Sequence, residues 1–193
     1  MSDTPVLPME KIGLPIVPMW GLLLPLNRFP IIPEITVGLR EVEIVWSTGL
    51  PMEHTRSGSD LLVRLDPGEE IHTSLKELAD DLGFDAAAIT SGIGRTRDNE
   101  YGYMDENGVY QRRSLNAPSE LVSLSGNIAR TEKGDAFTHI HCCWSDDGND
   151  VHAGHMFQAT VHVVAEIHIR VMDHASMTRC PLAEFELLGL EFD

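Results

Sequence analysis

Positively charged side chains are scarce in this sequence. Lys and Arg total 14 against 30 Asp and Glu, which gives a formal net charge of −16. Binding to DNA or to an anionic membrane surface needs clustered Lys and Arg, because those partners carry a dense negative charge. The nearest approach to such a cluster is the pair Arg112 and Arg113. We therefore expect no membrane partner, and nucleic acid is a disfavoured partner on physical grounds.

Cysteines and long apolar runs are also few. Three cysteines, two of them adjacent as Cys142 and Cys143, cannot build a disulfide framework, so we expect a reducing compartment and a cytoplasmic location. No apolar stretch reaches about 18 residues without a proline or a charge, which argues against a membrane-spanning helix. The opening MSDTPVLPMEK lacks a positive n-region and a small-residue cleavage site, so no secretory signal is expected.

Residues 1–55 differ in amino-acid composition from the rest of the chain. They are rich in proline and in apolar side chains, including Trp20 and the run Leu22-Leu23-Leu24. Proline removes an amide donor and fixes φ, which argues against a helix or a central strand. We predict an extended arm that packs along its own domain or along a neighbouring subunit. The alternative is a disordered tail, which would leave these apolar side chains in water.

Residues 56–193 predict one α+β domain with a mixed, mostly antiparallel sheet of about seven strands and one main helix. Apolar residues at helical spacing place the helix in EEIHTSLKELADDLG (69–83), where Gly83 suits the C-terminal cap. Asn107-Gly108 between two alternating runs predicts a hairpin turn. Further strands are predicted in SDLLVRLD (59–66), DAAAITSGIG (85–94), SELVSLSGNIA (119–129), AFTHIHCCW (136–144) and QATVHVVAEIHIRVM (158–172).

The segment THIHCCWSDDGNDVHAGH, residues 138–155, holds four of the nine histidines and two of the three cysteines. Alternate residues of a strand share a face, so His139 and His141 project from the same side with Cα atoms about 6.5 Å apart. The polar turn that follows lets the chain double back. It would bring His155, and less directly His152, beside the pair.

Three neutral imidazoles suit zinc or another first-row transition ion and leave one position open for water or substrate. The alternative is that His139 and His141 are hydrogen-bonded sheet residues, which is the commoner case for an isolated HxH pair. The presence of His155 across the turn favours the metal site. Gly154 precedes it, and a glycine there would allow a close backbone approach at a crowded site. Cys143 shares the strand face of the pair and is the reserve ligand.

Glu166 is the candidate catalytic residue. In VHVVAEIHIR it falls on one strand face together with His162 and His168. If that face meets the metal pocket, Glu166 is placed to act as a general base or to orient a ligand. If that face meets water, Glu166 is a solvated carboxylate, and this alternative stays open.

The order AAAITSGIG, ELVSLSGNIA, FTHIHCCWSDDGNDVHAGHMFQATV resembles the PPC domain (plants and prokaryotes conserved domain, also called DUF296) over residues 56–192. The resemblance implies a mixed α+β fold that assembles as a homotrimer, with a histidine metal site near subunit contacts. Carried over to this chain, the ligands are His139, His141 and His155. The family often has Gly-Gly-His where this chain has Ala-Gly-His at residues 153–155, a small departure that leaves the ligand in place.

The resemblance specifies a site but no reaction. The leading hypothesis is a metal-dependent enzyme that hydrolyses, hydrates or isomerises a small polar or anionic molecule, with Glu166 moving the proton. A DNA-associated regulatory protein of the PPC type is the first alternative, although no Arg-Gly-Arg-Pro core occurs here. A small cupin barrel also uses HxH, but Ser145, Asp146 and Asp147 stand where its glutamate is expected. A non-catalytic small-molecule binding module is the remaining alternative.

Overall fold

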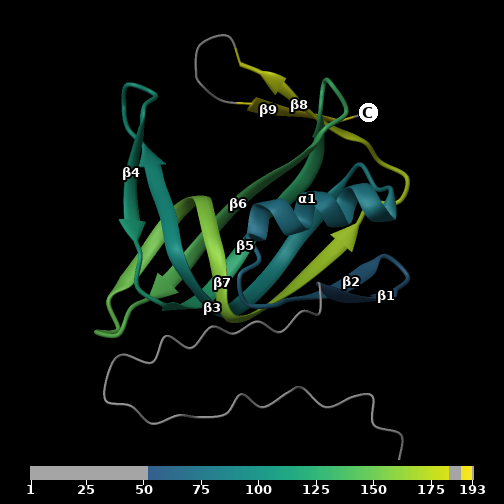
Figure 1. The fold of residues 1–193 in the computed structure, drawn as a ribbon. Coiled ribbons are helices and arrows are strands. Elements are labelled where there is room, and N and C mark those ends of the chain that lie inside the picture. The colour runs from purple at the N-terminus through teal and green to yellow at the C-terminus, as the bar shows by residue number, and fades with distance from the viewer. Residues whose placement is uncertain (1–51, 183–187, 193) are drawn as a thin grey trace, which may run out of the picture. The chain divides into compact units, whose positions relative to one another are not determined.

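The computed structural model describes residues 52–182 and 188–192. Nearly all of the predicted arm lies outside these residues, so its course stays a prediction. The described part contains one helix and nine strands (Figure 1). In chain order they are β1 (Glu53–Ser57), β2 (Asp60–Leu65), α1 (Ile71–Leu82), β3 (Ala87–Met104), β4 (Tyr110–Leu115), β5 (Ser119–Thr131), β6 (Ala136–Ser145), β7 (Val151–Val171), β8 (Met177–Pro181) and β9 (Leu188–Phe192).

The nine strands form one sheet in the order β1-β2-β7-β3-β5-β8-β9, with β4 beside β3 and with β6 paired to both β5 and β7. Every pairing is antiparallel except that of β5 with β8. The mixed, mostly antiparallel sheet with one helix is therefore confirmed. The prediction of about seven strands left out β1 and β8, two five-residue strands with a weak alternation signal.

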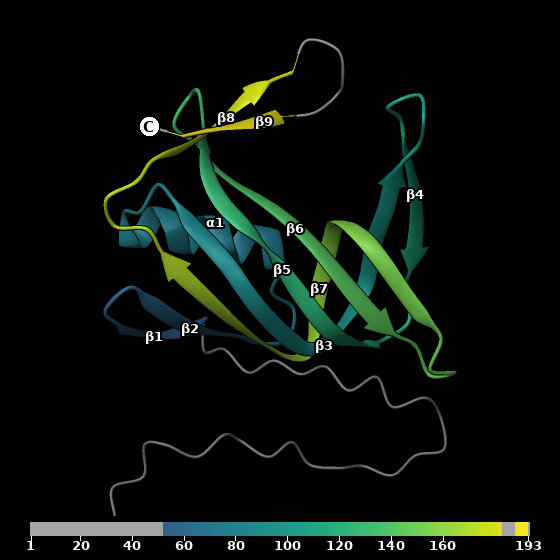
Figure 2. The same ribbon diagram turned by 180° about the vertical axis from the view of Figure 1, so that it is seen from behind.

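The two longest strands, β3 with 18 residues and β7 with 21, carry the curvature of the sheet. Their pairing contains several register shifts, which bend strands. As a result β7 pairs with β6 near its start and with β2 near its end. Figures 1 and 2 show β7 turning sharply between these two parts. This bend decides which side chains of β7 reach the candidate site.

Helix α1 packs on the inner face of the sheet against β5, β6 and β7. It forms for the predicted reasons, because Ile71, Leu75 and Leu78 make one buried stripe. The side chain of Glu70 accepts hydrogen bonds from backbone amides in the first turn, and Gly83 ends the helix in the left-handed conformation at φ 66°. Among the described residues, no helix has the length and apolar content to cross a bilayer.

Candidate metal centre

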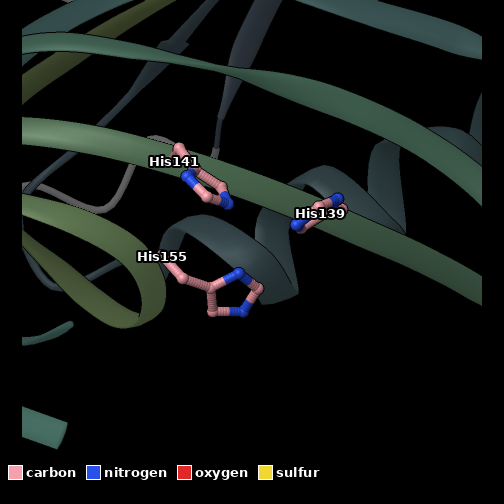
Figure 3. A group of neighbouring side chains, drawn as sticks. All are labelled: His139, His141 and His155. Carbon is pink, nitrogen blue, oxygen red and sulfur yellow. The ribbon is translucent and has the colours of Figure 1, made fainter. Parts of the chain in front are cut away.

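Three histidine rings converge at the junction of β6 and β7. His139 and His141 lie on β6, and His155 on β7 is the register partner of His141. One ring nitrogen from each lies within 4.8 Å of the others, and the ring centroids are 5.1, 5.1 and 5.3 Å apart. Figure 3 shows a nitrogen of each ring turned toward a common space. The proximity predicted from strand alternation and chain reversal is confirmed.

The alternation of β6 explains which face carries the site. Ile140 and Trp144 are fully buried in the core. His139 and His141 occupy the alternate positions of the strand, so their side chains point to the opposite face. The rings therefore sit on the face of β6 opposite the core, where a small molecule can approach them. His141 is the exposed ring of the three, and His139 and His155 are half-buried.

Two glycines let the backbone pack closely enough to hold this geometry. A Cβ on Gly154 would lie 2.5 Å from the carbonyl oxygen of Gly102 on β3, and one on Gly126 would lie 1.9 Å from the carbonyl oxygen of His139. Either methyl group would push a strand aside, because both obstacles are backbone atoms. The close backbone approach expected at Gly154 is present, and it brings β7 against Gly102 on β3.

His72 on α1 supports the site from the core side, and the sequence reasoning missed it. One ring nitrogen lies 2.7 Å from Oγ1 of Thr138 on β6, and the other donates to the carbonyl oxygen of Met156 on β7 at 3.1 Å. These two residues directly precede His139 and follow His155. Burial is the main cause that lowers the pKa of His72, so the ring is neutral at pH 7. The sequence signal that could have identified His72 is its position: it is a polar residue next to Ile71, beside the buried apolar stripe of the helix.

The surroundings keep two of the clustered rings uncharged. Burial lowers the pKa of His139 to about 4, and the positive charge of Arg179 adds to the effect. Burial likewise lowers the pKa of His155 to about 4, with further contributions from the neighbouring histidines and from Arg112. Both rings are therefore neutral at pH 7, the state in which an imidazole can coordinate a metal ion.

A pocket of about 420 Å³ opens over two of the three histidines, His139 and His155. Aromatic rings form part of its wall, and two arginines reach into it. The aromatic residues are Tyr110, Phe137 and Phe157, and the arginines are Arg112 and Arg179. A concave, partly apolar pocket with a few convergent polar groups is typical of a small-molecule site.

Arg179 is the second residue that the sequence reasoning missed. It lies on β8, outside the histidine segment, and its guanidinium Nη2 is 3.3 Å from Nδ1 of His139. Its neighbour in the pocket, Arg112 on β4, places its Cζ atom 3.8 Å from the ring centroid of Phe157. Nothing in the local sequence marks Arg179, because its contact with His139 spans 40 positions and depends on the parallel pairing of β8 with β5.

The structure does not bring Glu166 to the histidines within one chain. Glu166 lies in the far half of β7, opposite Arg64 on β2 and Ile93 on β3, and its side chain is exposed. Strands β3 and β5 lie between this part of β7 and β6, and the group of metal-capable side chains found among the described residues contains the three histidines without Glu166. The bend in β7 directs its two halves to different places, so the catalytic role of Glu166 stays a prediction that this geometry does not support.

Two further candidate ligands also lie outside the cluster. His152 makes other contacts: Nε2 is 2.9 Å from Oδ2 of Asp146, and Nδ1 is 2.9 Å from the hydroxyl oxygen of Tyr101. Cys143 shares the strand face of the pair, but the group of metal-capable side chains found among the described residues contains the three histidines without it. The reserve ligand is not needed to complete this geometry.

The geometry of strands, helix and histidines is matched by a family model. The Plants and Prokaryotes Conserved (PCC) domain model aligns with residues 52–173, which include all three histidines. The chain belongs to the PCC domain family. This is the family that the sequence resembles under the name PPC. The matched region of the PCC domain stops before β8, so Arg179 lies beyond it.

Solved structures with the PCC fold come from archaea and bacteria. A metal-containing protein from Archaeoglobus fulgidus is 31% identical, with 70% of this chain and 95% of that chain covered and a TM-score of 0.62. A plant- and prokaryote-conserved protein from Pyrococcus horikoshii is 27% identical, with 76% and 98% covered and a TM-score of 0.61. A proposed DNA-binding protein from Ralstonia eutropha is 21% identical, with 72% and 94% covered and a TM-score of 0.64; it shares the fold. Among proteins of curated function, none matches the chain.

Proposed function

We propose that this PCC domain protein binds one divalent transition ion per chain, zinc in the simplest case, through His139, His141 and His155. The observation that carries the proposal is the convergence of three ring nitrogens within 4.8 Å. Nδ1 of His155 fits this role, because it is buried and has no hydrogen-bond partner among the described residues. A buried polar atom of this kind normally has a partner, and a metal ion would supply one. The metal-containing relative at 31% identity supports the same assignment.

The protein is proposed to be a metal-dependent enzyme that acts on a small polar or anionic molecule. Three protein ligands leave a coordination position open, and an ion held this way polarises a carbonyl group or makes bound water more acidic. The chain itself supplies a pocket beside the histidines, an aromatic wall that limits access of water, and two arginines that favour an anion. Hydrolysis, hydration and isomerisation all fit this arrangement. A binding module without turnover would use the same features.

Metal content tests the proposal directly. Protein purified without chelator is expected to contain about one transition ion per chain by elemental analysis, and His139→Ala and His155→Ala are expected to lose most of it. His162→Ala is the matched control, because His162 lies on β7 outside the cluster. Metal-free wild-type protein, or full metal content in both ligand variants, would contradict the proposal.

The PCC domain is further proposed to assemble as a homotrimer. Four exposed aliphatic side chains on the consecutive strands β2, β7, β3 and β5 support a contact between copies: Leu62, Val163, Ile93 and Val122. Exposed apolar side chains gathered on one sheet are typical of an interaction surface. Light scattering is expected to give the mass of three chains for wild-type protein and a smaller mass for Ile93→Arg. Val151→Arg, at an exposed position elsewhere, should leave the mass unchanged.

A further inference from the structure

Arg179 is a buried cation whose partners in the described part of the chain are uncharged. Its side chain belongs to a residue only 6% exposed. Nη1 donates to the carbonyl oxygen of Leu188 at 3.0 Å, and Nη2 donates to Oδ1 of Asn127 at 2.6 Å. Such a group ordinarily pairs with an anion, because an uncompensated buried charge is costly.

A partly buried arginine, Arg130, shows by contrast what Arg179 lacks. Arg130 places its guanidinium against the carboxylates of Asp80 and Asp85. For Arg179, no ion pair with an Asp or Glu is found in residues 52–182 and 188–192, and Nε has no hydrogen-bond partner there. Arg130 is thus paired with two carboxylates, whereas Arg179 has a buried donor, Nε, without a partner among the described residues.

The contact between Arg179 and His139 depends on the metal state. A guanidinium can only donate, so the Nη2 of Arg179 must meet the lone pair of Nδ1 of His139 across 3.3 Å. A neutral imidazole has one lone pair in the ring plane and one N–H. If the metal takes Nε2, Nδ1 carries the proton and cannot accept; if the metal takes Nδ1, the lone pair is used. Metal ligation by His139 therefore excludes this hydrogen bond.

Loss of this hydrogen bond would release a matched pair of donors. Nη2 regains an N–H, and Nε has no partner among the described residues. These two nitrogens form the side-on fork of a guanidinium, whose spacing matches the two oxygens of a carboxylate or of a phosphate. The fork lies beside His139, so an oxyanion held there sits next to the position of the metal.

The other residues that line the pocket indicate what kind of molecule fits there. The ring centroid of Phe137 lies 5.6 Å from the guanidinium carbon of Arg179, and Tyr110 and Phe157 pack edge to face with centroids 5.2 Å apart. A pocket of about 420 Å³ holds a small molecule with an apolar or aromatic body. Arg112 lies above Phe157 on the same wall, and its guanidinium is 3.6 Å from a carboxylate oxygen of Glu100.

We propose that the pocket takes a small organic acid whose oxyanion group binds the side-on fork of Arg179 beside the metal, and that this anion subsite opens when the metal is bound. The proposal rests on the metal centre proposed above and names the substrate class of that site. The shared chemistry is a carboxylate or phosphate on a small, partly apolar body.

Calorimetric titration of zinc-loaded and metal-free protein tests the proposal. Benzoate and phenyl phosphate are the probes, and benzyl alcohol is their neutral counterpart. Zinc-loaded protein is expected to bind at least one of the two anions and not the alcohol, and metal-free protein to bind neither. The anion with the lower dissociation constant shows whether the subsite prefers a carboxylate or a phosphate. Arg179→Gln and Arg179→Lys are expected to weaken binding about 10- to 100-fold, the range that corresponds to lost hydrogen bonds to a charged group.

Arg170→Gln is the control, because Arg170 lies exposed on β7 and pairs with Asp60. Arg179→Lys keeps the charge but lacks the fork, so an unchanged dissociation constant in this variant would overturn the proposal. Equal anion binding by metal-free protein would overturn the coupling to the metal. If Arg179→Gln does not fold, NMR of wild-type protein replaces it. The Nε–H resonance of Arg179, assigned by its absence from the lysine variant, must shift when the anion that binds is added. Measuring zinc content in every sample separates failure of the metal centre from failure of the anion subsite.

Discussion

Removal of the metal should make the protein sensitive to acid, and His139 and His155 should be the cause. In an unfolded chain these rings take up protons near their ordinary pKa of 6.5, whereas in the folded protein they do so at about 4. Between these pH values the unfolded state binds more protons. The free energy of unfolding of the metal-free protein must therefore fall as the pH drops from 6.5 toward 4.

The size of the effect follows from the same pKa values. A gap of about 2.5 pH units at about 1.4 kcal/mol per unit gives about 3 kcal/mol for one ring. The two rings are only half-buried and influence each other, so their contributions do not add in full. We expect the pair to cost about 3 kcal/mol between pH 7 and pH 4, a large share of the stability of a typical domain.

Urea unfolding at a series of pH values measures this cost. Metal-free wild-type protein is compared with the double variant His139→Gln/His155→Gln, which keeps polar side chains but cannot be protonated. All other acid-sensitive groups are common to both proteins, so the difference between the two pH profiles isolates the two rings. Zinc added at about 100 times its dissociation constant should raise the free energy of unfolding at pH 7 by about 2.7 kcal/mol in the wild type alone. Parallel profiles for wild type and variant would refute the reasoning.

Three further predictions concern the sheet, the surface charge and the arm. Gly126→Ala should cost about 2–4 kcal/mol in urea unfolding and reduce metal content, because its Cβ would meet the carbonyl oxygen of His139; wild-type stability would contradict this. DNA titrated in a fluorescence anisotropy assay at about 150 mM salt should show no sub-micromolar binding, given the net charge of −16; tight binding would disprove it. Protein truncated before Met52 should form a weaker oligomer by light scattering, and an equally stable oligomer would show that residues 1–51 are a tail.

The part of the site that could be predicted from the sequence is the part built by local rules. Alternation along one strand places His139 and His141 on a common face, and one short turn returns the chain to His155. Both steps span fewer than twenty residues, so neither needs knowledge of the whole sheet. The helix is predictable for the same reason, since its apolar spacing and its Gly83 cap are contained in one segment.

The features that the sequence did not predict all depend on distant pairing. Glu166 shares β7 with His155, yet register shifts between β3 and β7 bend the strand and send the two residues to different places. Arg179 reaches His139 because β8 joins β5 in the one parallel pairing of the described sheet, well outside the histidine segment. A metal centre made by two adjacent antiparallel strands is thus a local feature of the chain, whereas the anion subsite proposed here exists only once β8 has joined the sheet.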